Sequence, residues 1–213
     1  MKTLRIALLA AALTAGLHGA DDQGTALSPE AGEGEWRPLV ERLAAKGVVV
    51  ANFTEKRYFP FRRGPTTLKG VMRFVPGRGL SLQYTEPEPS ILIADSEGLL
   101  LRDKEGRTQA VPADSRETGA IASLLPIMRF DLGALYPRFF VRAYHEGAGW
   151  RFTFTPRNAD FGRSLGEISI SGTGTTVTHI EFRHSSSTRV EIDDSETAGS
   201  APLSEAELKR YFR

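Results

Sequence analysis

The sequence predicts a mainly β fold in which a few helices cover an antiparallel sheet. Three observations point to this class. The 21 glycines and 12 prolines are spread along the 213 residues, as expected of many short elements separated by turns. About eleven short segments alternate apolar and polar residues with the period of a strand. Only a few segments have helical spacing, and a hydrophobic content of 40% suffices for one core.

Residues 1–20 have the pattern of a secretory signal peptide and are set apart from the fold. Lys2 and Arg5 precede an apolar run over residues 6–17, which is too short for an ordinary membrane span. Cleavage after Ala20 is the first choice, and cleavage after Gly16 is the competitor. Loss of the two basic residues leaves 25 of the 27 basic residues against 26 acidic ones. This balance does not favour a nucleic-acid partner.

The chain contains no cysteine. An exported protein without cysteine forms no disulfide and carries no lipid on an N-terminal cysteine, so packing must hold its fold. We therefore expect a protein that is free in the periplasm of a host with two membranes, and secretion beyond the cell is the alternative. Residues 21–35 are polar and glycine-rich, which predicts a flexible leader.

An amphipathic helix is predicted over Trp36–Lys46, ending at Gly47, because apolar residues recur there at helical spacing. Strands follow almost without pause. The eleven predicted strands are Val48–Tyr58, Thr66–Val75, Leu80–Tyr84, the runs at Ile91–Ile93 and Leu99–Leu101, Arg107–Val111, Phe139–His145, Trp150–Thr155, Gly166–Ser171, Val177–Arg183 and Thr188–Asp193. Each presents one apolar face.

The segment Arg116–Arg138 interrupts the strands and predicts two short helices, because apolar residues from Ile121 to Leu135 have helical spacing. Asp131 is expected to cap the second helix and Pro137 to end it. A sheet with one apolar face needs a cover, and this segment can supply it together with the first helix. Periodicity leaves two alternatives open: a filled core, or a curved sheet that encloses a ligand cavity.

The sequence offers little for catalysis, so an enzyme is the least favoured class and no cofactor is expected. Beyond the signal peptide the histidines are His145, His179 and His184; the last two fall on opposite strand faces, which makes a poor metal pair. The carboxylates at Asp193-Asp194 and at Glu86 and Glu88 are interpreted as solvated turn charges. The sequence has no phosphate-binding loop, dinucleotide fingerprint or Gly-x-Ser-x-Gly motif.

An ordered series of motifs resembles the periplasmic lipoprotein carriers of the LolA family. The series begins with "ANFTEKR" (Ala51–Arg57), continues with "GVMRFVPGRGLSLQYTEPEPSILIADSEGLLLRD" (Gly70–Asp103), and ends with the strand-Pro-loop-strand segment "FTFTPRNADFGRSLGEISIS" (Phe152–Ser171). Together these motifs span most of Val48–Asp193.

The resemblance implies an unclosed antiparallel β-barrel of eleven strands with a helical lid, formed by residues 36–194. It implies a hydrophobic cavity for the acyl chains of lipoproteins or related lipids, which the protein would carry as a monomer from an inner-membrane exporter to an outer-membrane acceptor. Arg78 matches the family arginine that bonds lid carbonyls and latches the empty carrier. The implied cavity residues are Phe53, Phe74, Leu82, Tyr84, Ile91, Ile93, Leu124, Ile127, Met128, Phe130, Phe152, Phe154, Ile168, Ile170, Ile180 and Phe182.

Two further segments are predicted from the residues themselves. Residues 195–213 are interpreted as a linker and a short helix, with Ser204 and Glu207 in a capping box and Leu208 and Phe212 on one face that can dock on the barrel. The segment "RYFPFRRGP" (Arg57–Pro65) mixes aromatic and arginine residues, which fits a basic hairpin loop or a contact with anionic headgroups.

The alternative function is a lipid-sensing regulatory module in the periplasm. It is implied by the same resemblance, because LolA-like domains also occur in periplasmic regulators. The C-terminal helix stands where the best-known carriers continue with another strand and loop, which favours a specialised member of the family.

Overall fold

The computed structural model describes residues 24–111, 123–197 and 201–213. The predicted signal peptide with its cleavage site lies outside the described residues. So does the first part of the predicted central helical segment, up to Ala122.

The fold is built on one sheet of twelve antiparallel strands in the order β1-β8-β9-β10-β11-β12-β2-β3-β4-β5-β6-β7. The strands are β1 (Thr25–Leu27), β2 (Val49–Tyr58), β3 (Thr66–Val75), β4 (Gly79–Glu86), β5 (Ser90–Asp95), β6 (Gly98–Arg102), β7 (Thr108–Ala110), β8 (Phe139–Glu146), β9 (Gly149–Pro156), β10 (Glu167–Thr173), β11 (Thr176–Arg183) and β12 (Arg189–Thr197). All eleven predicted strands are present.

The twelfth strand, β1, corrects the prediction of a flexible leader over residues 21–35. Thr25–Leu27 pairs with Val141–Ala143 of β8, and Leu27 is buried in the core. The physical reason is that the edge of β8 offers backbone hydrogen bonds and that Leu27 adds apolar burial beside it.

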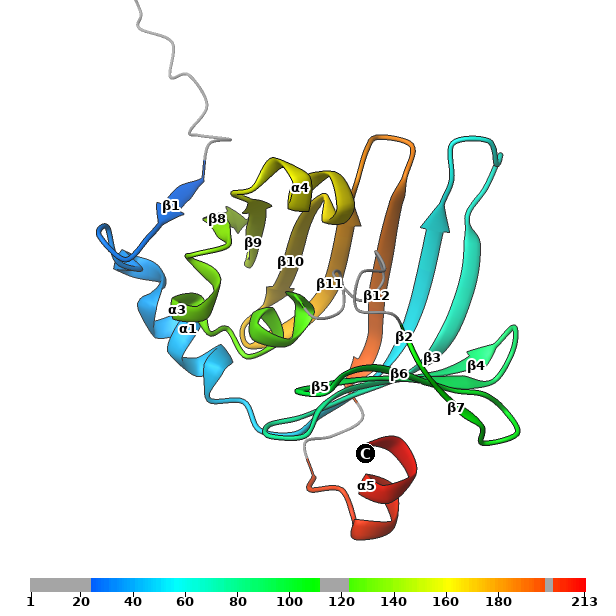
Figure 1. Ribbon diagram of the computed structural model, residues 1–213. Coiled ribbons are helices and arrows are strands. Elements are labelled where there is room, and N and C mark those ends of the chain that lie inside the picture. Colours follow the sequence, from blue (N-terminus) through cyan, green and yellow to red (C-terminus); the bar gives the residue numbers. More distant parts are fainter. Residues whose placement is uncertain (1–23, 112–122, 198–200) are drawn as a thin grey trace, which may run out of the picture.

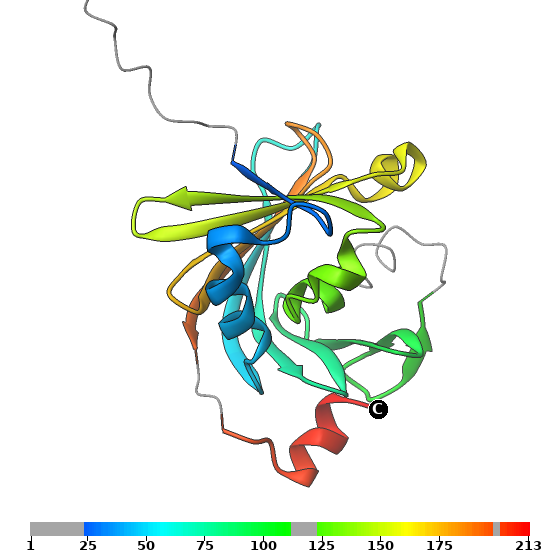
Figure 2. The same ribbon diagram turned by 90° about the vertical axis from the view of Figure 1, so that its left-hand side faces the viewer.

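The sheet is open, because its order begins at β1 and ends at β7 without pairing between them in the described chain. The strands β8–β12, β2 and β3 stand side by side, and β4–β7 fold across their lower end, so that the sheet curls around a concave face (Figure 1). A view turned by 90° shows the helices on this concave side enclosed by the sheet (Figure 2).

Short helices lie along this concave side. A 3-10 turn, η1 (Gly34–Trp36), leads into α1 (Arg37–Ala44), which has a proline in its first turn and ends three residues before the predicted Gly47. Residues 123–128 are helical and α3 (Leu132–Leu135) follows. Asp131 caps α3 as predicted, because its carboxylate accepts a hydrogen bond of 3.1 Å from Ala134 N–H.

The helix α4 (Ala159–Leu165) corrects the loop that was expected between β9 and β10. Asn158 starts it, because its Oδ1 accepts from the N–H groups of Asp160 and Phe161 at 2.9 and 3.0 Å. This capping signal stands in the sequence directly after a proline-arginine turn and was not recognised.

The C-terminal helix α5 (Glu205–Tyr211) has the predicted capping box between Ser204 and Glu207. It lies outside the sheet, below β4–β6 (Figure 1). Phe212 is buried, in agreement with the predicted docking face. The second buried residue of this segment is Tyr211, whereas Leu208 is half-buried. Across the described ranges, no helix combines the length and hydropathy needed to cross a membrane.

Candidate functional site

The concave face carries a continuous apolar wall. Alternation fixes it: in β3 Met72 and Phe74 point to this face while Arg73 points to the convex one. Among the predicted site residues, those on the wall and buried in its core cluster are Phe53, Phe74, Leu82, Tyr84, Phe152, Phe154, Ile168, Ile170, Ile180 and Phe182. The wall therefore crosses from β9 to β4, over more than half of the sheet.

Residues 123–135, here called the cover, close the wall from the inside. The predicted cover residues Leu124, Ile127, Met128 and Phe130 are all buried in the same cluster, and Leu132 and Leu135 of α3 join them. The side chains of Leu124 and Ile127 are fully buried. The structure thus brings the two predicted groups, wall and cover, into one apolar core.

The cover makes backbone hydrogen bonds within itself. Its first helix ends in a Schellman motif, in which Phe130 N–H donates to Ile127 O and Asp131 N–H donates to Pro126 O, at 2.9 and 3.1 Å. Phe130 holds the left-handed position of this motif, with φ 48°. Glycine is usual there, because a side chain makes the conformation costly.

Packing explains why a phenylalanine occupies that position. The Phe130 ring makes edge contacts with Trp150 and Phe152, with centroids 5.9 and 5.7 Å apart. The ring therefore ties the turn of the cover to the wall, and the packing offsets the strain of the backbone.

The concave face is filled in this conformation. A space of about 30 Å³, enough for roughly two water molecules, lies between wall and cover. It is lined by Leu43, Lys46, Val49, Met72, Phe74, Met128, Phe130, Thr176, Val177 and Asp194. Of the two alternatives that periodicity left open, this conformation is the filled core.

Asp194 corrects the interpretation of Asp193-Asp194 as solvated turn charges. Both lie in β12, on opposite faces. The Asp194 side chain lines the small internal space beside Lys46, and its Oδ1 is buried with no hydrogen-bond partner among the described residues. Burial raises the pKa of Asp194 to about 6, against the opposing effect of Lys46. Strand alternation could have placed this carboxylate inside.

A second polar group on the concave face was also missed. Glu55 is buried, and its carboxylate accepts hydrogen bonds from Tyr84 Oη at 2.7 Å and from Arg57 Nε. Burial and the nearby Glu55 raise the pKa of Tyr84. The predicted wall residue Tyr84 thus marks the polar end of the wall, and the Glu-x-Arg spacing in β2 was the signal for it.

Ile91 and Ile93 are not on the wall, which corrects their prediction as cavity residues. Ile93 pairs with Ser81, which pairs with Arg73, so these side chains share the convex face. Ile93 is fully buried there, and α5 lies on this side of β4–β6 (Figure 1). The wall receives Leu92 and Ala94 from β5 instead, and both belong to or pack on its cluster.

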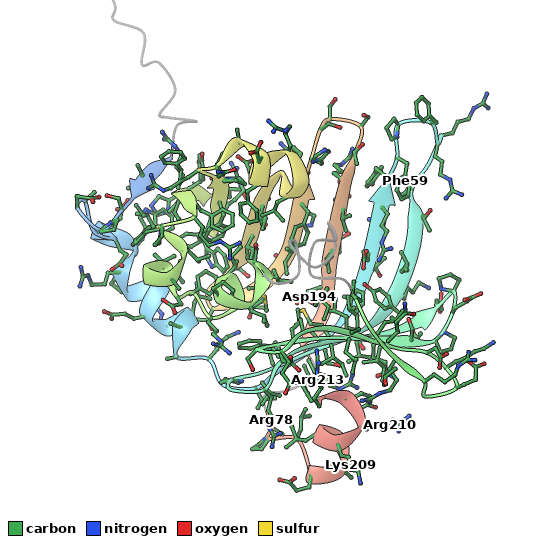
Figure 3. The ribbon with its side chains drawn as sticks, viewed as in Figure 1. Phe59, Arg78, Asp194, Lys209, Arg210 and Arg213 are labelled. Atoms are coloured by element: carbon green, nitrogen blue, oxygen red, sulfur yellow. The ribbon has the colours of Figure 1, made fainter. Side chains whose placement is uncertain are left out.

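Arg78 lies in the exposed turn between β3 and β4, beside the cover (Figure 3). A cleft of about 230 Å³ separates it from the cover, and is lined by Gly77, Arg78, Gly79, Asp95, Ser96, Leu125, Pro126, Arg129, Asp131 and Ala134. Within the described ranges the Arg78 side chain makes no hydrogen bond. The structure therefore places Arg78 next to the cover, and its latch role stays a prediction.

The glycine that follows Arg78 is required by the strand pairing. Gly79 has φ +115°, and a Cβ there would lie 2.1 Å from the carbonyl oxygen of Ala94 in β5. The φ of +115° at Gly79 also excludes proline at this position, because the proline ring fixes φ near −65°.

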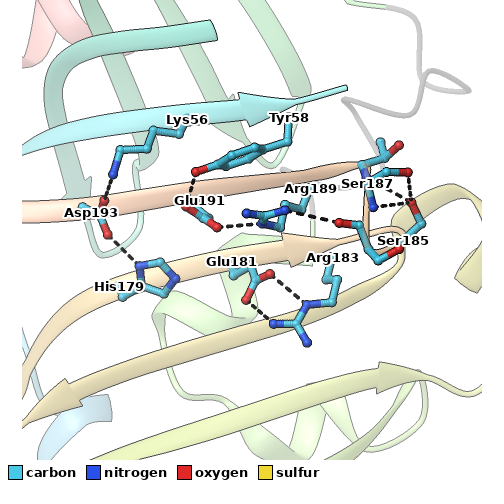
Figure 4. A network of polar contacts seen from close by, with 12 residues as sticks. Lys56, Tyr58, His179, Glu181, Arg183, Ser185, Ser187, Arg189, Glu191 and Asp193 are labelled. Carbon is cyan, nitrogen blue, oxygen red and sulfur yellow. Dashed lines mark hydrogen bonds and ion pairs between the residues drawn. The ribbon is translucent and has the colours of Figure 1, made fainter. Parts of the chain in front are cut away.

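The convex face of β2, β11 and β12 is polar, in contrast to the wall behind it (Figure 4). Asp193 accepts from Lys56 Nζ at 3.0 Å and pairs with His179 Nδ1 at 2.7 Å. Burial alone would raise the pKa of Asp193, yet the bonds from His179 and Lys56 hold it below its ordinary value. In the part of the chain that the structure describes, no three His, Asp or Glu side chains are grouped to hold a metal ion.

Comparison with known proteins finds likeness only among solved structures, since no protein-family model and no curated protein match the sequence. A LolA superfamily protein from Nitrosomonas europaea has a TM-score of 0.44 and 8% identity, covering 81% of this chain and 96% of that chain. A putative outer membrane lipoprotein-sorting protein domain from Vibrio parahaemolyticus has a TM-score of 0.43 and 9% identity, covering 82% and 94%.

LprF from Mycobacterium bovis is a third similar structure, with a TM-score of 0.37 and 13% identity, covering 84% of this chain and 97% of that chain. At these identities the likeness concerns the fold and says nothing of what this chain binds. The chain is similar in structure to LolA superfamily and lipoprotein-sorting proteins, the family that its ordered strand motifs resemble.

Proposed function

We propose that this protein is a periplasmic carrier that holds the acyl chains of lipoproteins or related lipids against the concave wall and moves them from the inner to the outer membrane. The observation that carries the proposal is the pairing of a continuous apolar wall with an apolar cover whose turn is closed by hydrogen bonds inside the cover. An inner-membrane exporter would load the carrier, and an outer-membrane acceptor would receive the cargo.

An acyl chain can take the place of the cover without disturbing the sheet. The Schellman motif and the Asp131 cap are internal to the cover, so they persist when the cover lifts as a unit. Lifting separates apolar side chains such as Leu124, Ile127 and Leu135 from the wall. A methylene chain restores the same kind of packing, because apolar burial is not directional.

Displacement of the cover also sets the affinity in a useful range. Each buried methylene contributes roughly 0.8 kcal/mol, so about twelve of them supply roughly 10 kcal/mol before any cost. Lifting the cover consumes part of this free energy, which keeps the cargo exchangeable. The space of about 30 Å³ beside Met128 and Phe130 is too small for an acyl chain, which supports binding through displacement of the cover.

The experiment uses Trp150 as a reporter of the cover. The chain has two tryptophans, and the Trp36→Phe variant leaves only Trp150, which contacts Phe130 of the cover. Palmitic acid and a diacylated lipopeptide are titrated into this variant while its emission is recorded, and native mass spectra of the same samples count the bound molecules. Saturating emission changes together with discrete lipid adducts are the expected result.

The matched control is Trp150→Phe, which leaves Trp36. Trp36 contacts Phe152 and His145, outside the cover, so its emission should change less. Unchanged emission in both variants together with a spectrum free of adducts would show that the concave face is only a packed core, and the proposal would fail.

A further inference from the structure

The hairpin that joins β2 to β3 ends in an exposed aromatic tip, here defined as residues 59–65. Four large apolar side chains are exposed in the described part of the chain, and two of them, Phe59 and Phe61, stand at this tip. Phe61 is 99% exposed. A turn closed by Arg62 N–H and Phe59 O, at 3.2 Å, holds the two rings at the end of the hairpin. The position of Phe59 is visible at the upper end of β2 (Figure 3).

The tip itself carries basic charge: residues 59–65 contain Arg62 and Arg63 and no acidic residue. The basic residues that flank the tip pair with carboxylates, Lys56 with Asp193, Arg57 with Glu55 and Lys69 with Glu86. Arg62 and Arg63 directly follow the exposed Phe61. The side chain of Arg62 donates to Thr66 Oγ1, which keeps its guanidinium beside the tip. Aromatic rings flanked by cations form a surface that is complementary to an anionic one.

A neighbouring hairpin lies beside the tip. β12 pairs with β2, with Arg189 opposite Tyr58, so the loop between β11 and β12 lies next to the tip. Both hairpins project from the same end of the sheet, opposite to α5 (Figures 1 and 2). Arg189 lies over the Tyr58 ring, 3.7 Å from its centroid. Arg189 also pairs with Glu191 at 2.7 Å, so the neighbouring hairpin supports the tip through strand pairing rather than through added charge.

The shape of the tip favours a lipid surface over a folded protein partner. A stable protein interface buries about 800 Å² on each side and needs a complementary shape. The end of one hairpin offers a few side chains and a fully exposed ring. A bilayer interface needs no complementary shape, and it accommodates aromatic rings together with Arg and Lys.

We propose that this tip contacts anionic membrane surfaces, with Phe61 and Phe59 entering the headgroup region and Arg62 and Arg63 pairing with lipid phosphates. This membrane contact is separate from the proposed transport of acyl chains, because it needs no cargo and involves none of the wall residues. It would place the protein at the bilayer while its concave face receives or releases a chain.

The first measurement is flotation of the full chain, free of lipid, with vesicles of phosphatidylcholine alone or mixed with phosphatidylglycerol. Phe61→Ser should lower the partition coefficient on mixed vesicles by on the order of tenfold. Arg62→Gln and Arg63→Gln should each lower it about fivefold on the mixed vesicles and leave it unchanged on pure phosphatidylcholine. Added salt should lower the partition coefficient of the wild type on mixed vesicles towards the values of the arginine variants.

The second measurement locates the tip directly. Trp36 and Trp150 are both buried, so a Phe61→Trp variant carries one exposed tryptophan. Its emission should shift to the blue on mixed vesicles, and acrylamide should quench it less. The matched control is Phe140→Trp in β8, where the native ring is 53% exposed and away from the tip; its emission should stay the same.

Two outcomes would overturn the proposal. One is a Phe61→Ser variant that floats as the wild type does, and the other is a Phe61→Trp emission that vesicles leave unchanged, which would point to a protein partner instead. Neither outcome bears on acyl-chain uptake, because vesicle binding is measured without cargo.

Discussion

The sheet carries two apolar covers, one on each face, and they are fastened in different ways. The cover of residues 123–135 lies on the concave wall and is attached by apolar side chains and the Phe130 ring. The second one, here called the clasp, consists of α5 with residues 212 and 213 on the convex face of β3–β6.

The clasp has polar anchors as well as apolar ones. The Arg73 guanidinium stacks over the Tyr211 ring at 3.6 Å, and Arg102 donates to the carbonyl oxygen of Arg210. Arg213 pairs with Asp95 at 2.8 Å and donates to Gly98 O at 3.0 Å. These interactions have fixed geometry, and an acyl chain offers no substitute for them.

The difference teaches which of the two surfaces can exchange its cover. The packing of the concave cover is non-directional and can be replaced by methylenes, whereas the clasp depends on charged and planar groups. We therefore expect the clasp to stabilise the fold and the cover to regulate access to the wall. The predictions below test this division of roles.

The largest expected effect is at the clasp. Phe212→Ala removes a fully buried ring and should lower the free energy of unfolding by about 3 kcal/mol or more, while lipid uptake stays as in the wild type. Urea denaturation and native mass spectrometry measure the two quantities. Phe140→Ala, at a half-exposed ring, is the control and should change little. Loss of uptake at unchanged stability would reverse the assignment of the clasp.

The next effect is at the cover. Ile127→Ala should weaken the closed state by about 2 kcal/mol, and since the closed cover competes with cargo, the apparent lipid affinity should rise roughly tenfold or more. Ile180→Ala, at an equally buried isoleucine of the wall, should lower the affinity instead. Fluorescence titration measures both variants, and a parallel loss of affinity in both would argue against an exchangeable cover.

A smaller effect concerns Asp194 and depends on pH. Its pKa of about 6 lies above the ordinary value of 3.8, so folding disfavours its charged form. This penalty is absent below pH 3.8, develops up to pH 6 and is complete above it. Asp194→Asn should therefore be more stable than the wild type at neutral pH, on the order of 1 kcal/mol after allowance for solvent screening.

Denaturation at several pH values checks this prediction, with the adjacent Asp193→Asn as control. The pKa of Asp193 is lowered by its bonds to His179 and Lys56, so its carboxylate stabilises the fold above pH 3.8 and the contribution is lost as the pH falls. At neutral pH, Asp194→Asn should raise the free energy of unfolding and Asp193→Asn should lower it. Equal effects would mean that the two faces of β12 do not differ as described.

The smallest effect is expected at Arg78. Because its side chain is exposed and makes no hydrogen bond within the described residues, Arg78→Leu should change the free energy of unfolding by less than about 0.5 kcal/mol. Lipid affinity should change less than twofold. A tenfold change in affinity would instead assign Arg78 the latch role that the resemblance implies, through a conformation other than this one.

Most of the wall could be predicted from sequence because its strands alternate cleanly. In β9 the polar residues Arg151 and Thr153 separate Trp150, Phe152 and Phe154, so only one assignment of faces is compatible with burial. The same alternation of apolar and polar residues assigns the faces of β10 and β11. Turn residues bounded these strands within one or two positions, since glycine and proline act locally.

The alternation is ambiguous in β5, where the prediction failed. Ile91, Leu92, Ile93 and Ala94 form an unbroken apolar run, which is the pattern of a strand that is buried on both faces. The clasp, whose Arg213 pairs with Asp95 of β5, lies more than 100 positions away in the chain. Nothing local could indicate which face it covers.

The sequence alone determined the class of the fold, the eleven main strands and the capped ends of the helices, because these follow from side-chain period and from groups a few residues apart. Tertiary structure decided which face of β5 joins the wall, that β1 completes the sheet, that Asp194 is inside, and how closely the cover fills the concave side. These outcomes depend on distant segments competing for the same surface, and that competition is resolved only when the whole chain packs.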